Sequence, residues 1–330
     1  MTSGPDDGSL AIESRALTKV FGSQRAVDSI DLAVPRGSVF GFLGPNGSGK
    51  TTSIRMMLGL VQATSGDVRV LGEQMPNRLR EVLPRVGALV EGPAFYPFLS
   101  GEANLRRFDS ADRHASSATR RARVASALDR VGLTAAAAKK AGAYSLGMKQ
   151  RLGIANALLQ PRELLVLDEP TNGLDPQGTR EVRSLVRSFA AEGTTVFVSS
   201  HLLAEVEQIC THAAIMSAGA LVAQGPLAQL RGAGQSSVRI TTPDPGAAAS
   251  VLARFGLTPT SLETVRATAE VSALLPVPDE PGSTNGRVDI DAILPALVRA
   301  GVRVRGFAVE EPSLEDRFVA LTGEGFDVVR

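Results

Sequence analysis

The sequence has almost no cysteine and very few aromatic residues. Cys210 is the only cysteine among 330 residues, so the chain forms no internal disulfide and fits a reducing compartment. Tryptophan is absent and tyrosine occurs twice, which leaves no aromatic platform for the bases of a single nucleic-acid strand. We interpret Cys210 itself as a small apolar residue buried on a helix.

Excess charge and long apolar runs are also missing. The formal net charge at pH 7 is +1 and no long basic run occurs, which argues against nucleic acid as a partner. No apolar run reaches the roughly 18 to 20 residues of a membrane-spanning helix. The first ten residues, MTSGPDDGSL, are polar and acidic, unlike a signal peptide. We expect residues 1–10 to be a disordered lead, and the chain to be cytosolic unless a partner holds it at a membrane.

The sequence does contain a regular alternation of short apolar runs and helical patterns. The runs SVFGFLG, RVGALVE, ELLVLDE, TTVFVSS and HAAIMS have the length and composition of buried strands. Between Phe95 and Asn156 the strand signal disappears, and apolar residues recur at helical spacing in an Ala- and Arg-rich segment. The alternation predicts an α/β fold whose largely parallel sheet is covered on both faces, with a helical subdomain inserted at about 96–156.

The pattern changes after about residue 232. Residues 238–242, 247–255, 265–275, 290–300 and 302–309 predict a strand, a helix, one or two strands, a helix and a strand. The segment SLEDRFVALTG predicts a last helix that is capped by Ser313, with Asp316 in the capping box and Gly323 at its end. We therefore expect a main domain over 11–232 and a small α+β domain over 233–330, for which a ferredoxin-like arrangement is one option.

The segment GPNGSGKT lies between a predicted strand and a predicted helix. It matches G-x-x-x-x-G-K-[ST], the pattern of a phosphate-binding loop, whose glycines let backbone N–H groups surround phosphates. Lys50 is expected to reach the β- and γ-phosphates, and the Thr51 hydroxyl to ligate Mg²⁺. The residues predicted to bind the nucleotide here are Gly44, Pro45, Asn46, Gly47, Ser48, Gly49, Lys50, Thr51 and Thr52.

Three further polar residues end predicted strands. The segment LLVLDEP places Asp168 and Glu169 at the end of an apolar strand, where an aspartate can hold the Mg²⁺ shell. The adjacent Glu169 is placed to polarise an attacking water. The segment TTVFVSSH ends another strand with His201. Ligands of open α/β folds bind at the carboxyl edge of the sheet, so we include His201 in the predicted site.

These motifs together resemble the nucleotide-binding subunit of an ABC transporter. The phosphate-binding loop, SLGMKQR, LDEPTNGLD and the strand-end histidine follow the order and spacing of that family over about residues 11–230. The resemblance implies a P-loop NTPase fold and an ATPase that uses ATP and Mg²⁺. It implies that Glu169 is the general base and that His201 contacts the γ-phosphate. It also implies that Phe21 stacks on adenine, rather than being a core aromatic, and that Asp175 lies along a dimer interface.

The stretch YSLGMKQRL is similar to the signature sequence of this family. That signature binds the γ-phosphate held by the phosphate-binding loop of another subunit, so Ser145 and Gly147 are expected to face the nucleotide of a second copy. Two ATP molecules would then lie between two head-to-tail cassettes. The family signature is usually Leu-Ser-Gly-Gly-Gln, whereas this chain has Tyr144, Leu146 and Met148 at the other three positions.

Glu91, in ALVEGPAFYPFLS, stands where the family usually has a glutamine. A carboxylate can also ligate Mg²⁺ through oxygen, so the predicted metal ligands are Thr51, Asp168 and Glu91. The family couples to its membrane subunit through the region after this position. Phe95, Tyr96 and Phe98 form an aromatic cluster there that suits a docking surface or, alternatively, the core of a buried loop.

The segments EGPAFYPFLS and EPSLED resemble the branch of the family that exports drugs, antibiotics or lipids. We expect the chain to power such an exporter through ATP-driven pairing of two cassettes, held by permease subunits at the cytoplasmic face of the cell membrane. An importer subunit is the closest alternative. Ribosome-acting relatives carry two cassettes in one chain, and chromosome-maintenance ATPases carry a long coiled coil before the signature. This chain has one phosphate-binding loop and no sustained heptads between Lys50 and Ser145.

Overall fold

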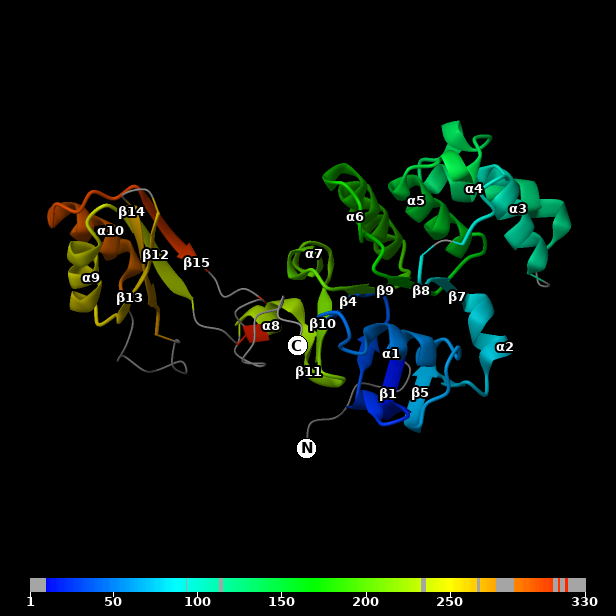
Figure 1. Ribbon diagram of the computed structural model, residues 1–330, viewed down its shortest axis with the longest axis horizontal. Helices are drawn as coiled ribbons and strands as arrows, with labels where there is room; N and C mark the ends of the chain where they lie inside the picture. Colours follow the sequence, from blue (N-terminus) through cyan, green and yellow to red (C-terminus); the bar gives the residue numbers. More distant parts are fainter. Residues whose placement is uncertain are drawn as a thin grey trace. The chain divides into compact units, whose positions relative to one another are not determined.

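The computed structural model describes most of the chain as two compact units. The described residues are 10–92, 94–112, 115–232, 236–265, 268–276, 288–310, 314 and 318–319. The first unit runs to Leu227 and the second begins at Ala228, and the elements of each can be followed in Figure 1. The lead predicted over residues 1–10, apart from Leu10, and most of the helix predicted around 313–323 lie outside the described residues.

A six-stranded sheet of order β11-β10-β4-β9-β8-β7 forms the centre of the first unit. Its strands are β4 (Val39–Leu43), β7 (Val86–Leu89), β8 (Leu164–Asp168), β9 (Thr195–Ser200), β10 (His212–Ser217) and β11 (Ala220–Pro226). All neighbours pair in parallel except β10 and β11, which pair antiparallel. Every residue of β4, β8 and β9 is buried, as is usual for parallel strands covered on both faces. The predicted α/β fold is confirmed.

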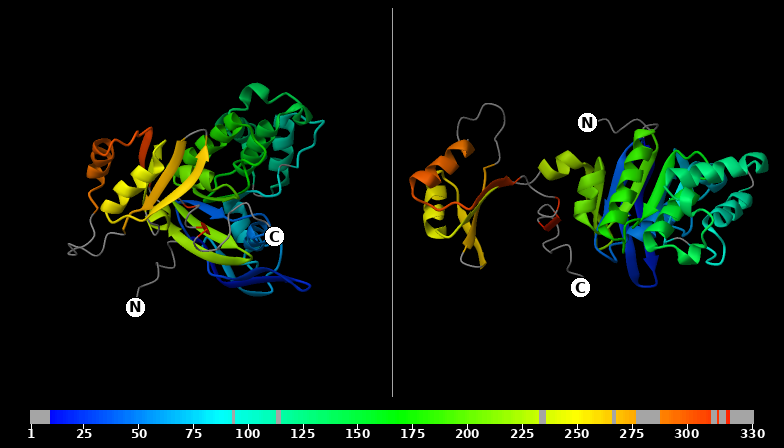
Figure 2. Two further views of the ribbon diagram at one scale, coloured as in Figure 1. Left: turned by 60° about the vertical axis from the view of Figure 1, so that its left-hand side comes forward. Right: turned by 90° about the horizontal axis from the view of Figure 1, so that it is seen from above.

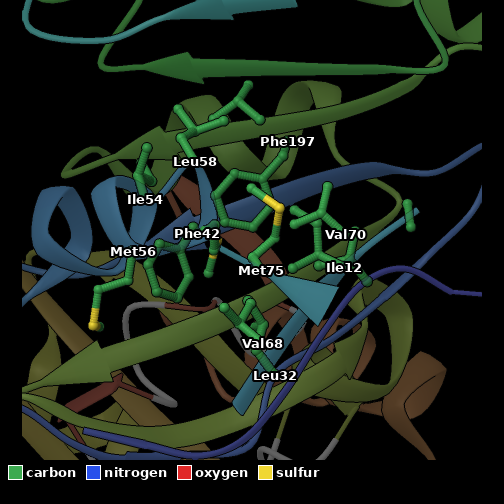
Figure 3. Packing of buried hydrophobic residues seen from close by; sticks show 14 of the residues in the cluster. Ile12, Leu32, Phe42, Ile54, Met56, Leu58, Val68, Val70, Met75 and Phe197 are labelled. Atoms are coloured by element: carbon green, nitrogen blue, oxygen red, sulfur yellow. The ribbon is translucent and has the colours of Figure 1, made fainter. Parts of the chain in front are cut away.

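A second, antiparallel sheet packs against the same core. It contains β1 (Leu10–Phe21), β2 (Gln24–Ile30), β3 (Ala33–Pro35), β5 (Ser65–Val70) and β6 (Glu73–Met75). Phe42 and Phe197 of the parallel sheet share one buried cluster with Ile12, Val68 and Val70 of the antiparallel sheet (Figure 3). Each fully buried side chain of this size contributes about 1.5–3 kcal/mol. The cluster also contains residues of α1 (Lys50–Met57), which anchors the helix that follows the phosphate-binding loop.

Only helices occur in the described residues between β7 and β8, apart from one isolated bridge. They are α3 (Gly101–Ala111), η2 (Ser117–Thr119), α4 (Arg120–Arg130), η3 (Thr134–Ala136), η4 (Ala141–Ala143) and α5 (Leu146–Ala157). The carboxylate of Asp109 is fully buried and pairs with Arg120 and Arg123 of the next helix. This pairing joins α3 to α4 within the helical subdomain that was predicted at about 96–156.

The remaining helices of the first unit lie around the sheets. They are α2 (Leu79–Val82), η1 (Leu83–Arg85), α6 (Pro176–Ala191) and α7 (Leu203–Ile209), and α8 (Leu227–Gly232) spans the division between the units. Helix α7 packs directly on β4, because a Cβ added to Gly41 would lie 2.6 Å from Val206 Cγ1. The glycine therefore permits an unusually close approach of α7 to the strand that leads into the phosphate-binding loop.

The second unit has the ferredoxin-like arrangement that the sequence left as one option. Its elements are β12 (Ser237–Thr242), α9 (Pro245–Arg254), β13 (Pro259–Val265), β14 (Thr268–Leu274), α10 (Ile290–Arg299) and β15 (Gly306–Glu310). The strands form an antiparallel sheet of order β13-β14-β12-β15, and both helices cover one face of it (Figure 2). The core between the sheet and the helices includes Val238, Ile240, Val271, Ile293 and Leu297.

Polar side chains line the opposite face of this sheet along its central strand β12. Burial alternates along β12, so Ser237, Arg239 and Thr241 lie on the face away from the helices. Arg239 pairs with Glu270 of β14 at 3.2 Å and with Glu310 of β15 at 2.7 Å. One guanidinium thus joins three strands of the sheet on its polar face.

Asp244, just before α9, connects the start of this helix to Arg303, which lies between α10 and β15. Its carboxylate accepts hydrogen bonds from the Arg303 backbone N–H at 3.0 Å, from Nε at 2.9 Å and from Nη2 at 2.6 Å. The hydrogen bonds of the Arg303 side chain lower the pKa of Asp244 from 3.8 to about 2. A carboxyl whose folded pKa is depressed contributes stability above its unfolded pKa and loses that contribution as the pH falls through the folded value.

We therefore expect Asp244→Asn to lower the unfolding temperature of the second unit at pH 7. The difference between the parent and the variant should shrink below about pH 4 and be mostly lost by about pH 2. Calorimetry of the full chain measures this difference, and the transition of the second unit is the one that added ATP does not raise. A difference that stays constant from pH 7 to pH 2 would contradict the proposed role of the Asp244 charge.

Candidate active site

The phosphate-binding loop connects β4 to α1. Gly49, the last residue before the helix, has a φ of +100°, and a Cβ on it would lie 2.5 Å from the carbonyl oxygen of Ala26. Asn46 and Gly47 are exposed at the tip of the loop. Ser48 is only 3% exposed, and its hydroxyl has no hydrogen-bond partner among the described groups. Because buried hydroxyls normally have partners, this one fits a loop that receives the oxygens of a ligand.

Lys50 is folded back against this loop. Its ammonium donates to the carbonyl oxygens of Gly44 at 2.6 Å and Pro45 at 3.2 Å, and it lies 3.5 Å from Glu169 Oε1. Burial lowers the pKa of Lys50, and the charge of Glu169 opposes that effect. The lysine thus sits as a buried cation between the loop and the carboxylate that follows β8.

Asp168, the last residue of β8, is held by hydroxyl groups on both sides. Thr51 Oγ1 donates to Asp168 Oδ2 at 3.1 Å, and Ser199 Oγ donates to Asp168 Oδ1 at 2.5 Å. Ser199 is not among the residues predicted from the sequence. The signal that could have identified it is the register of the sheet, because Asp168 of β8 and Ser199 of β9 are direct neighbours across the parallel pair.

Glu169 lies between the lysine and the histidine of the predicted site. Its Oε2 is 2.7 Å from His201 Nδ1, and its backbone N–H donates to Ser199 Oγ at 2.9 Å. Its backbone is in the left-handed region with a φ of +48°, which is uncommon for a non-glycine residue. Strained backbone of this kind concentrates at functional sites. The structure therefore brings together Lys50, Thr51, Asp168, Glu169 and His201.

Two predicted residues lie apart from this group. Phe21, at the end of β1, is 47% exposed, with Lys19 Nζ 4.8 Å from the centre of its ring. Glu91, just after β7, has a φ of +62° and forms an ion pair with Arg55 of α1. In the part of the chain that the structure describes, no contact joins Glu91 to Thr51 or Asp168. Both residues are accessible, and their roles toward a nucleotide stay predictions.

The signature stretch begins α5 and is open to solvent. Ser145 caps the helix by accepting a hydrogen bond from the Met148 backbone N–H at 3.2 Å. Ser145 and Leu146 are exposed. A Cβ on Gly147 would meet nothing closer than 3.8 Å, at Leu174 Cδ2, so nothing in the described part of this chain excludes a side chain there.

Tyr144, which replaces the usual leucine of the signature, points into the helical subdomain. It is 4% exposed, and its hydroxyl donates to the Ala136 carbonyl oxygen at 2.7 Å. Burial raises the pKa of this phenol. A Cβ on Gly101 would lie 2.2 Å from the Tyr144 hydroxyl, so Gly101 leaves the space that the larger residue needs. The substitution is accommodated inside the subdomain and leaves Ser145 at the helix start.

Asp175 caps α6 in the same way as Ser145 caps α5. Its Oδ1 accepts a hydrogen bond from the Gly178 backbone N–H at 2.7 Å, and the residue is exposed. Capping of this kind is sufficient to explain an aspartate at this position, and a contact with a second copy of the chain is not needed to explain it. The predicted interface role of Asp175 stays a prediction.

The site geometry agrees with the proteins that this chain resembles. The family model for ABC transporters matches residues 27–172. The bacitracin transport ATP-binding protein BcrA of Bacillus licheniformis is 38% identical over 96% of this chain and 99% of its own length. The chain belongs to the ABC transporter ATP-binding family. The daunorubicin/doxorubicin resistance ATP-binding protein DrrA of Streptomyces peucetius is 34% identical over 96% of this chain and 94% of its own length.

Solved structures of this family share the fold of the first unit. The cassette cbiO1 of Clostridium perfringens, part of an ABC transporter complex, has a TM-score of 0.61 at 26% identity. It covers 66% of this chain and 89% of its own length. As a member of the family, the chain is an ATPase subunit that binds nucleotide and is part of a membrane transporter complex. ATPase cassettes of this family work with membrane permease subunits. Among the described helices, none has the length and apolar character needed to span a membrane.

The two loop glycines provide a matched test of this site. Gly49→Ala places a side chain at φ +100° and drives it into the Ala26 carbonyl, whereas Gly47→Ala at φ +80° meets nothing within 4 Å. We expect Gly49→Ala to abolish ATP binding and to destabilise the chain by roughly 2 kcal/mol or more. Gly47→Ala should cost only the backbone strain of about 1–2 kcal/mol. Thermal unfolding and ATP titration measure both effects, and equal losses of stability would contradict this account of Gly49.

Proposed function

We propose that this chain hydrolyses ATP to power a membrane exporter of antibiotics or related drugs and lipids. The observation that carries the export assignment is the extent of the match to the bacitracin and daunorubicin relatives, which includes the second unit as well as the cassette. An importer subunit remains the alternative to be tested. We further propose that the cassette comprises residues 11–232 and that residues 233–330 form an accessory domain, as the division after Leu227 supports.

We propose that Glu169 is the general base of hydrolysis. Its carboxylate is contacted by Lys50 on one oxygen and by His201 on the other, which fixes its orientation at the edge of the sheet. A carboxylate in this position accepts a proton from the attacking water. Lys50 exchanges the carbonyl oxygens of its own loop for phosphate oxygens when ATP arrives, and His201 contacts the γ-phosphate.

The residues present fit a Mg²⁺ ion that enters with the nucleotide. The Thr51 hydroxyl and the Asp168 carboxylate are hard oxygen donors 3.1 Å apart. No group of three His, Cys, Asp or Glu side chains that could hold a metal occurs in the described residues. Mg²⁺ commonly takes its other ligands from substrate phosphates and water. When bound, the ion would neutralise phosphate charge, and Glu91, which pairs with Arg55 through one carboxylate oxygen, would offer it a further oxygen ligand.

We propose that a second copy of the cassette completes each nucleotide site. The support is the exposure of Ser145 and Leu146 and the open space at Gly147. Free backbone N–H groups at a helix start bind anions such as the γ-phosphate. Phe21, exposed at the end of β1, stacks on the adenine of the nucleotide that its own loop binds.

We propose that the permease docks beside Glu91, on the cytoplasmic face of the membrane. Phe98 is 66% exposed and contacts Tyr96, over which Arg107 lies 4.6 Å from the ring centre. These exposed rings favour a docking surface over the core of a buried loop. A cavity of about 230 Å³ opens nearby between β7, α3 and the end of α5, with Phe108 and Arg162 in its lining.

Replacing the proposed base tests hydrolysis and export together. Glu169→Gln should retain ATP binding and lose most hydrolysis in the complex with the permease, because general-base assistance is typically worth about 10²–10⁴-fold. Lys50→Ala should instead weaken nucleotide binding itself. ATP titration and phosphate release measure the two effects, and near-normal turnover of Glu169→Gln would remove this residue from the role.

The same variants distinguish the directions of transport. Cells that carry the parent chain with its permease should accumulate less daunorubicin and tolerate more bacitracin than cells without them. Cells that carry Glu169→Gln should behave like cells without the transporter. Higher drug accumulation with the parent chain would contradict export and favour the importer.

Cross-linking tests the head-to-tail pairing. In a Cys210→Ala background, which removes the only cysteine, Asn46→Cys and Ser145→Cys place thiols on the exposed loop tip and on the signature. A short bifunctional thiol reagent should join two chains and double the mass on a denaturing gel, even where the gap exceeds the roughly 7 Å Cα separation of a disulfide. Mixing the two single-cysteine chains should give the same product. Cross-links confined to single chains would show that the signature serves its own loop.

A further inference from the structure

Glu205, on α7, is a buried carboxylate to which none of the proposed catalytic roles applies. It is 6% exposed, and its Oε2 accepts hydrogen bonds from Thr171 Oγ1 at 2.6 Å and from Ser200 Oγ at 3.1 Å. Arg183 of α6 lies 3.6 Å from its other oxygen. Burying a carboxylate is costly, and an apolar residue of similar size would fill this space without that cost.

The two hydroxyl groups belong to the segments that carry the proposed catalytic pair. Thr171 is two residues after Glu169, and Ser200 is directly before His201. Both are buried, and Ser200 Oγ also accepts from the Leu202 backbone N–H at 3.0 Å. One carboxylate oxygen therefore ties the chain after β8 to the chain after β9.

The helix that carries Glu205 is itself fixed to the phosphate-binding strand. Val206, the next residue, packs against Gly41 of β4 at the close approach described above. Ser199, by contrast, holds Asp168 and the backbone of Glu169. The consecutive serines of β9 thus have different tasks, because Ser199 acts at the end of β8 and Ser200 acts through Glu205 on the residues beyond it.

We infer that Glu205 is a positioning residue for ATP hydrolysis, which holds Thr171 and Ser200 so that Glu169 and His201 keep their 2.7 Å contact. The inference rests on the proposed roles of Glu169 and His201. Acceptance of the two hydroxyl hydrogen bonds is the property that matters, rather than the charge of Glu205. A displacement of about 1 Å in a catalytic group can cost about 10²-fold in rate.

Two substitutions of similar size separate these properties. Glu205→Gln keeps a carbonyl oxygen that can accept from both hydroxyls, whereas Glu205→Met fills the space and accepts nothing. In the full chain with its permease, we expect Glu205→Met to lower kcat by about 10- to 100-fold while the Kd for ATP changes less than about twofold. Glu205→Gln should retain at least about half of the parent kcat. Thr171→Val added to Glu205→Met should reduce kcat little further, because the shared contact is already lost.

Thr211→Val is the matched control for stability. Thr211 lies just after the C-terminal end of α7, and its hydroxyl donates to the Val39 carbonyl oxygen. Removing this hydroxyl should lower the unfolding temperature without lowering kcat per folded molecule. Unchanged kcat in Glu205→Met, or equal losses in Glu205→Met and Glu205→Gln, would overturn the inference. Glu169→Gln, measured in parallel, distinguishes a failure of the proposed base from a failure of the role of Glu205. If Glu169→Gln remains active, the proposed base is wrong. If Glu169→Gln is inactive while Glu205→Met keeps the parent kcat, only the role of Glu205 is wrong.

Discussion

The register between β8 and β9 is the constraint on which the active site depends. Asp168 and Ser199 are direct neighbours in this parallel pair, and the hydrogen bond between them fixes the carboxylate that faces Thr51. Glu169 and His201 follow at the ends of the same two strands. Because side chains alternate between the faces of a sheet, a slip of one residue would turn Asp168 to the other face. The Ser199–Asp168 hydrogen bond is available only in the observed register, so the pairing of the strands and the site are specified together.

Much of this architecture follows from local sequence signals. The phosphate-binding loop, the strand that ends in Asp168 and Glu169, and the helical segment before Ser145 are each contained in short contiguous stretches. The second unit was also predictable, because its apolar runs alternate between strand and helix periods over 238–309. These features depend on the spacing of residues that are close in the chain, which a sequence displays directly.

The remaining features depend on residues that are distant in the chain. Ser199 and Asp168 become partners only through strand register, and Glu91 and Arg55 only because β7 ends near α1. Tyr144 occupies its position because Gly101, far from it in sequence, leaves the space. No periodicity or motif encodes such pairs, so a single sequence predicted the type of site but not the side chains that support it. The same holds for Asp109, whose partners Arg120 and Arg123 lie on another helix.

In the sheet of the second unit, the ion pairs of Arg239 have a consequence for how the protein behaves at high concentration. Arg239 lies between two carboxylates on three strands, and its side chain is about two-fifths exposed. A sheet that stacked on this face would have to strip water from all three charged groups. The ion-pair network therefore acts as a barrier to amyloid-like stacking. It protects a small domain whose other face already uses its apolar side chains to bind its own helices.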